Sequence, residues 1–94
     1  MANYLARVEL HKATSDDYDT LHEAMRKRGF SRFIFSGQNK KYRLPTGTYV
    51  ATGSSWTLQQ AYDFAIAGAA DTGKSSWVIV VDWQNGQFSL EEVK

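Results

Sequence analysis

The chain contains no cysteine, a single proline and no long hydrophobic run. Without cysteine it can form neither a disulfide framework nor a thiolate metal site, which agrees with the reducing cytoplasm where we expect the protein. The longest apolar run, Trp77–Val81, is far shorter than the roughly 20 residues of a membrane span, so we expect no association with a membrane. The N-terminus also lacks the pattern of a signal peptide.

The charge balance is close to neutral, with a formal net charge of +1. Any binding of nucleic acid therefore depends on where the charges lie and not on their sum. The hydrophobic share of 43% and the charged share of 22% are those of a globular protein, and 94 residues correspond to one domain, 1–94. A domain of this size buries only about 60–68% of its unfolded surface, so a dimer partner would add to a modest stability.

Residues 3–11 show the clearest pattern in the chain, because apolar and charged side chains alternate there. Side chains of a β-strand alternate between the two faces of a sheet, so this stretch predicts a strand with one apolar and one charged face. The apolar face is expected to pack against helices. It would hold Tyr4, Ala6, Val8 and Leu10, and the other face Leu5, Arg7, Glu9 and His11.

Two helices are predicted from apolar spacing and capping residues. The first covers residues 15–28, with Thr14 or Ser15 as its N-cap. The second begins at a capping box formed by Thr57 and Gln60 and is rich in alanine, which favours a helix and allows close packing on a sheet.

Three further strands are expected, at residues 30–36, at 77–83, and in one strand made of 40–44 and 48–52. The last is interrupted around Pro45, because proline cannot donate a hydrogen bond to a sheet ladder. The order of elements predicts an α+β fold, namely a ferredoxin-like βαββαβ sandwich. It would have one four-stranded antiparallel sheet with two helices on one face and the first strand in its interior.

A run of cations without any acid extends from residue 26 to residue 43. If these cations converge on one edge, they can contact an RNA backbone; otherwise they complete a helix terminus and keep the surface solvated. The interleaved aromatic residues, Phe30, Phe33, Phe35 and Tyr42, either stack on unpaired bases or belong to the core. The candidate RNA-binding residues are Arg26, Arg28, Arg32, Lys40, Lys41 and Arg43.

Arg7, Glu9 and His11 alternate on the charged face of the first strand and are the candidate catalytic residues. A carboxylate and an imidazole can act as base and acid in RNA cleavage, and an arginine can stabilise the phosphorane charge. The alternative is that His11 is only a half-exposed polar residue at a strand end. His11 and His22 lack metal-ligand spacing, so no metal site and no cofactor is expected; His22 is predicted to be a packed histidine.

The strand at 77–83 is apolar on both faces, although this chain's helices can cover only one. Such a strand predicts a homodimer through Trp77, Ile79, Val81 and Trp83. The competing account is that residues 88–94, a short extra strand or a tail after the Asn85-Gly86 turn, fold back and cover the edge.

Five segments of the sequence together resemble a small bacterial family related to GhoS: Asn3–Ala13, Tyr18–Met25, Gly29–Arg32, Tyr42–Pro45 and Thr72–Ser75. GhoS-like proteins are antitoxin endoribonucleases of type V toxin–antitoxin systems. Their ferredoxin-like fold is similar to that of the small CRISPR adaptation nuclease and of VapD. The resemblance implies cleavage of the messenger RNA of a small membrane toxin. This chain has Glu9 and His11 where the CRISPR-associated relatives carry a metal-binding aspartate at the end of the first strand.

A second function class also fits the sequence. The near neutral charge and the apolar strand at 77–83 are compatible with a non-catalytic protein-interaction module, such as a phage- or plasmid-borne inhibitor, that binds protein with its sheet face.

Overall fold

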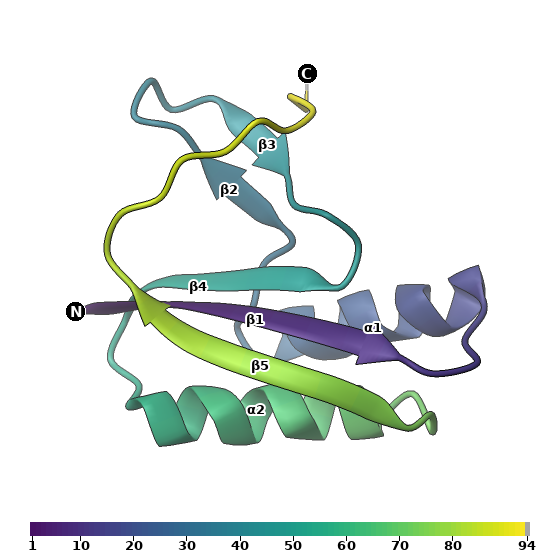
Figure 1. Ribbon diagram of the computed structural model, residues 1–94. Helices are drawn as coiled ribbons and strands as arrows, with labels where there is room; N and C mark the ends of the chain where they lie inside the picture. The colour runs from purple at the N-terminus through teal and green to yellow at the C-terminus, as the bar shows by residue number, and fades with distance from the viewer. Residues whose placement is uncertain (94) are drawn as a thin grey trace.

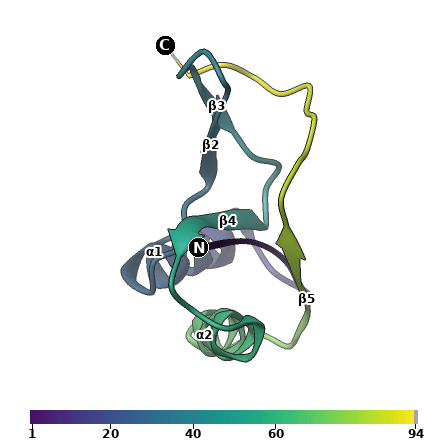
Figure 2. The ribbon, with the colours of Figure 1, turned by 90° about the vertical axis from the view of Figure 1, so that its left-hand side faces the viewer.

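A computed structural model describes residues 1–93 and confirms the α+β class. A three-stranded antiparallel sheet has the order β4-β1-β5, with β1 at its centre, and β2 and β3 form a separate hairpin (Figure 1). Both helices pack against one face of the sheet (Figure 2). The elements are β1 (Ala2–Leu10), α1 (Ser15–Lys27), β2 (Phe33–Phe35), β3 (Lys41–Arg43), β4 (Thr48–Ser54), α2 (Leu58–Ala70) and β5 (Ser76–Trp83).

The predicted alternation of β1 is confirmed. Tyr4, Ala6, Val8 and Leu10 are buried beneath the helices, whereas Arg7 on the opposite face is exposed. The core joins the apolar face of β1 to residues of α1, α2 and β4. A strand with period-two polarity at the centre of the sheet therefore fixes which face is covered and which stays open.

Both helices begin at predicted caps, and of the two candidates for the first helix it is Thr14, not Ser15, that caps it. Thr14 accepts a hydrogen bond from the Asp17 amide, and Thr57 accepts one from the Gln60 amide; the residue at the third helical position returns a bond in each case. Each capping box satisfies amides that would otherwise lack a partner at the first turn. Gly68 of α2 lies against α1, where a methyl group would come within 2.6 Å of a methionine sulfur.

The prediction of four strands in one sheet is only partly correct. The predicted second strand touches the sheet through a single bridge between Ser31 and Val50, after which the chain turns away into the β2–β3 hairpin. Residues 40–44 and 48–52 are not one interrupted strand, because β3 pairs with β2 and β4 pairs with β1. The turn between them is closed by a 2.9 Å bond from the Thr48 amide to the Pro45 carbonyl oxygen.

Residues 84–93 form a tail that runs to the hairpin and ends beside β3 (Figure 1). The Arg43 amide donates to the Glu91 carbonyl oxygen at 3.1 Å, and the Val93 amide donates to that of Lys41 at 2.8 Å. The competing account, in which residues 88–94 cover the edge of β5, is therefore wrong for the described part of the tail; Lys94 lies outside the described residues.

Candidate functional site

The face of the sheet opposite the helices is divided into a covered half and an open half. Beside β4 the face is covered, and Thr48 and Val50 are only 8% and 3% exposed. Along β5 it is open, and Trp77, Ile79 and Val81 are 71%, 60% and 41% exposed. Side chains this large are seldom left in water on a rigid strand without a use. We call the half that carries them the open face.

The three candidate catalytic residues lie on the open face, where the alternation of β1 places them. Arg7 pairs across the strands with Ile79, and Glu9 pairs with Trp77. The Nε2 atom of His11 lies 3.9 Å from a carboxylate oxygen of Glu9. The structure therefore brings the imidazole and the carboxylate together, with Arg7 one strand position further along the same face.

His11 is held in place by several contacts. Its backbone amide donates to the Ser75 carbonyl oxygen at 2.9 Å, and its Nδ1 lies 3.2 Å from the Ser75 hydroxyl oxygen. Its ring meets the Trp77 ring edge-on, with centroids 4.7 Å apart. The Nε2 atom is shielded from water and has no hydrogen-bond partner among residues 1–93. An oriented imidazole with one uncommitted nitrogen is suited to move a proton once a substrate reaches it.

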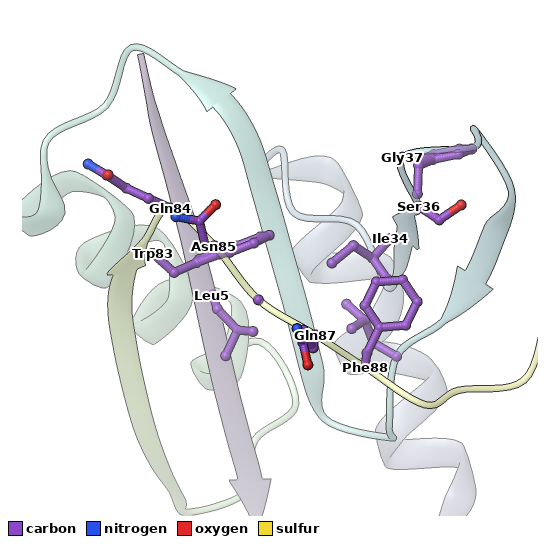
Figure 3. A pocket seen from close by; sticks show the side chains of 12 residues that line it. Leu5, Ile34, Ser36, Gly37, Trp83, Gln84, Asn85, Gln87 and Phe88 are labelled. Carbon is purple, nitrogen blue, oxygen red and sulfur yellow. The ribbon is translucent and has the colours of Figure 1, made fainter.

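A cleft of about 590 Å³ lies between the hairpin and the open face, and the tail runs along it from one side to the other (Figure 3). Trp83 and Asn85 lie on one side of it and Ile34 and Phe88 on the other, with Leu5 between them. The walls are mainly apolar, with amide and hydroxyl groups among them, which is the usual make-up of a binding cleft. Sequence reasoning missed this site, because its walls come from segments whose contact is not a local property; the Asn85-Gly86 turn was the only signal.

The run of cations is not one continuous surface. The Nε atom of Arg26 donates to the Glu23 carboxylate at 3.0 Å, and Arg28 donates to the Asp71 carboxylate at 2.7 Å. The bond from Arg26 lowers the pKa of Glu23. The other four candidate RNA-binding cations lie on or next to the hairpin, and the Lys41 ammonium sits 4.2 Å from the centre of the Phe33 ring. They are Arg32, Lys40, Lys41 and Arg43.

The aromatic residues interleaved with the cations also fall into different groups, some buried in the core and some exposed on the hairpin. Phe30 is 2% exposed and belongs to the core, whereas Phe35 on the hairpin is 57% exposed. Tyr42 packs on Phe88 of the tail, with ring centroids 5.0 Å apart. Phe35 is thus the most accessible of these rings for stacking with a ligand.

His22 is a packed histidine, as predicted. Its Nδ1 lies 2.6 Å from the hydroxyl oxygen of Tyr49, which links α1 to β4. Burial, assisted by the nearby Arg32 guanidinium, lowers the pKa of His22, and burial raises the pKa of Tyr49. A neutral His22 whose Nδ1 accepts a hydrogen bond from the Tyr49 hydroxyl agrees with both shifts.

This pair predicts a pH dependence of stability. Because the pKa of His22 is lowered in the folded protein, the unfolded chain binds the proton more readily near its usual value of 6.5. The stabilisation is complete above that value, and we expect the free energy of unfolding to fall as the pH drops through 6.5 toward the lower pKa of the folded state. Urea unfolding at several pH values measures this slope. His22→Asn should flatten it, and a slope equal to that of the unmodified protein would contradict the assignment.

Within residues 1–93 there is no cluster of three or more histidine, cysteine or acidic residues that could hold a metal ion. In the same range, no helix has both the length and the hydrophobicity of a membrane span. Comparison of the chain with protein-family models, with curated proteins and with solved structures finds no match.

Proposed function

We propose that this chain is a cytoplasmic single-stranded RNA-binding protein of ferredoxin-like fold that uses the open face and the hairpin as its interface. The observation that carries the proposal is Trp77, which is 71% exposed beside Arg7 and His11 on a rigid sheet. Unpaired bases stack on aromatic rings of this kind, and each stacked base contributes about 1–3 kcal/mol.

The cations give a path for the RNA backbone. The hairpin that carries Lys40, Lys41 and Arg43 lies on the β4 side of the sheet (Figure 2), so an RNA strand that extends from Trp77 to the hairpin would bring its phosphates to positive charge. The cleft between the open face and Phe88 is suited to a further base. Contacts are proposed for Arg26, Arg28, Arg32, Lys40, Lys41 and Arg43, of which the first two are also paired with acids.

We further propose that the bound RNA is cleaved, as the resemblance to GhoS-like antitoxins implies. His11 or Glu9 would take the proton from the 2′-hydroxyl, whose oxygen attacks the adjacent phosphorus. The other residue would protonate the departing 5′-oxygen, while Arg7 would stabilise the charge of the phosphorane. The 3.9 Å approach of His11 to Glu9 supports a shared role for the two groups.

The binding proposal is tested with a labelled single-stranded RNA and fluorescence anisotropy. Trp77→Ala should weaken binding roughly 5- to 150-fold without changing its salt dependence, because a neutral ring stacks on bases and releases no counterions. The matched control is Phe64→Ala, which removes a ring that is 38% exposed on the helix-covered side of the sheet. No RNA binding by the unmodified protein, or equal affinities for the two variants, would contradict the proposal.

The cations should show the opposite signature. Lys40→Ala and Arg43→Ala should each flatten the slope of log affinity against log salt by about one unit, whatever the RNA sequence. Lys74→Ala, whose ammonium lies 3.8 Å from the Asp17 carboxylate, serves as the control and should leave the slope unchanged. If neither hairpin substitution changes the salt dependence of the affinity, the RNA backbone does not contact the hairpin.

The second candidate function is a non-catalytic protein-interaction module, such as a phage- or plasmid-borne inhibitor. It is favoured by the apolar strip of Trp77, Ile79 and Val81 on the open face. A purified partner protein that binds in a stoichiometric complex and loses affinity with Trp77→Ala, while single-stranded RNA does not bind, would favour this class over RNA recognition.

A further inference from the structure

β5 is a free edge of the sheet over its whole length. Within residues 1–93 it pairs with β1 alone, in an uninterrupted register from Ser76 to Trp83, and the tail pairs with β3 instead. From Trp77 to Val81 it contains no charge, no proline and no bulge. Proteins protect free edges with such devices because an unprotected edge pairs with other chains. A long, regular and apolar edge is therefore expected to have a partner.

The hydrogen bonds of β1 show which backbone groups of β5 point toward the free edge. The Val8 amide donates toward β4, to the Gly47 carbonyl oxygen, and the His11 amide donates toward β5, to that of Ser75. Because these directions alternate along a strand, the odd-numbered residues of β1 bond to their partners in β5, such as Ile79. The amide and carbonyl groups of Val78 and Val80 consequently point outward, away from β1.

An apolar stripe on α2 lies below the same edge. Leu58, Tyr62 and Ile66 are four residues apart and are 48%, 42% and 39% exposed. Phe64, on the other flank of α2, packs on Trp56, and Gly68 faces α1. The stripe therefore lies on the flank turned away from α1, which is the side of β5 (Figure 2).

We infer that a second copy of this chain pairs along β5, antiparallel and about a two-fold axis at Ile79, with the α2 stripes in contact beneath the sheets. In this register Val78 of one copy bonds with Val80 of the other, and Ile79 faces its own counterpart in a pair without hydrogen bonds. Ser76 lies opposite Asp82, so no like charges meet. Two three-stranded sheets would become one six-stranded sheet, with the open faces side by side.

A second copy fits better than an unrelated strand, because three separate features match themselves under one two-fold axis. They are the outward backbone groups, the strip of Trp77, Ile79 and Val81, and the α2 stripe. An isologous contact needs this self-complementarity. Trp83 contributes less to the dimer interface than the sequence suggests. Its ring packs against the tail at Gly86, where a methyl group would lie 3.6 Å from the ring.

Cysteine cross-linking tests the register, since the natural chain has no cysteine. Directly opposed side chains in a pair without hydrogen bonds are close enough for a disulfide. Ile79→Cys should therefore form a covalent dimer under mild oxidation. Phe35→Cys, at an exposed hairpin position, is the control and should remain mainly monomeric. An Ile79→Cys protein that cross-links no faster than the control would overturn the register.

Charged substitutions at Ile79, on the two-fold axis, test whether the partner is a second copy of this chain. Sedimentation should give a dimer for the unmodified protein at micromolar concentration and monomers for Ile79→Lys and for Ile79→Glu, because like charges then meet. Mixing the two variants should restore a dimer, which shows that both monomers remain folded. An unmodified protein that stays at the monomer mass over a tenfold concentration range, or a mixture that does not associate, would overturn the inference. Both readouts are independent of RNA binding.

Discussion

Replacement of Gly47 by alanine is expected to destabilise the protein by about 2–4 kcal/mol, a large effect for one added methyl group. Gly47 has a φ angle of +84°, and a Cβ atom there would lie 2.4 Å from the Val8 carbonyl oxygen. That oxygen belongs to the backbone of the central strand, so it cannot move aside as a flexible side chain can. The Gly47 carbonyl oxygen also accepts the Val8 amide at 2.7 Å, and relief of the clash would lengthen this bond.

Substitutions at two other glycines distinguish the two causes of this loss of stability, backbone strain and the steric clash with Val8. Gly73 has a φ angle of +73°, but apart from its chain neighbours no described residue comes within 4 Å of where its Cβ would lie, so Gly73→Ala reports backbone strain alone, at about 1 kcal/mol. Gly37 has neither a positive φ angle nor a close neighbour, and its replacement should change stability by less than about 0.5 kcal/mol. Urea unfolding midpoints measure all three. If the midpoint of Gly47→Ala equals that of Gly73→Ala, the turn at Gly47 relaxes enough to remove the clash with Val8, and the prediction is wrong.

The parts of the fold that follow from local rules could be predicted from the sequence. The alternation of β1 and the caps at Thr14 and Thr57 depend on residues within four positions of one another, and each was found where expected. The division of β3 from β4 could not be predicted in this way. It depends on Gly47 meeting Val8 and on the tail pairing with β3, which are contacts between distant segments.

The same distinction explains what was found of the candidate site. Arg7 and Glu9 share a face of β1, and His11, the residue after the strand, continues the same alternation, so period two was sufficient to predict their grouping. For the cations the sequence leaves two interpretations open, a single RNA-binding edge or a completed helix terminus, because no acid interrupts them in sequence. Arg28 nevertheless meets Asp71, which lies 43 positions away, on the side of the helices. The sequence also did not predict the exposed apolar stripe of α2, because its exposure depends on how α2 packs relative to α1 and β5.

The catalytic hypothesis gives the largest functional effect. If the bound RNA is cleaved, His11→Ala should lower the cleavage rate by roughly 10²- to 10⁴-fold while the affinity for RNA changes little. The imidazole contacts Ser75, Trp77 and Glu9 at the surface and does not enter the core, so the fold should persist without it. Single-turnover cleavage of a labelled transcript measures the rate, and anisotropy measures the affinity.

Substitutions around His11 distinguish a proton-transfer role from a general loss of shape. Glu9→Gln keeps the size of the side chain but removes its charge, and it should also lower the rate by at least tenfold. Ser75→Ala removes the bond that orients the ring, at 3.2 Å, but no reacting group, so it should cost less than either change. The pH profile of the rate should lose one limb in His11→Ala, because each limb of a bell-shaped profile reports one of the two titrating groups. Cleavage at an unchanged rate and with an unchanged profile in His11→Ala would remove His11 from the chemistry and leave the open face as a binding surface alone.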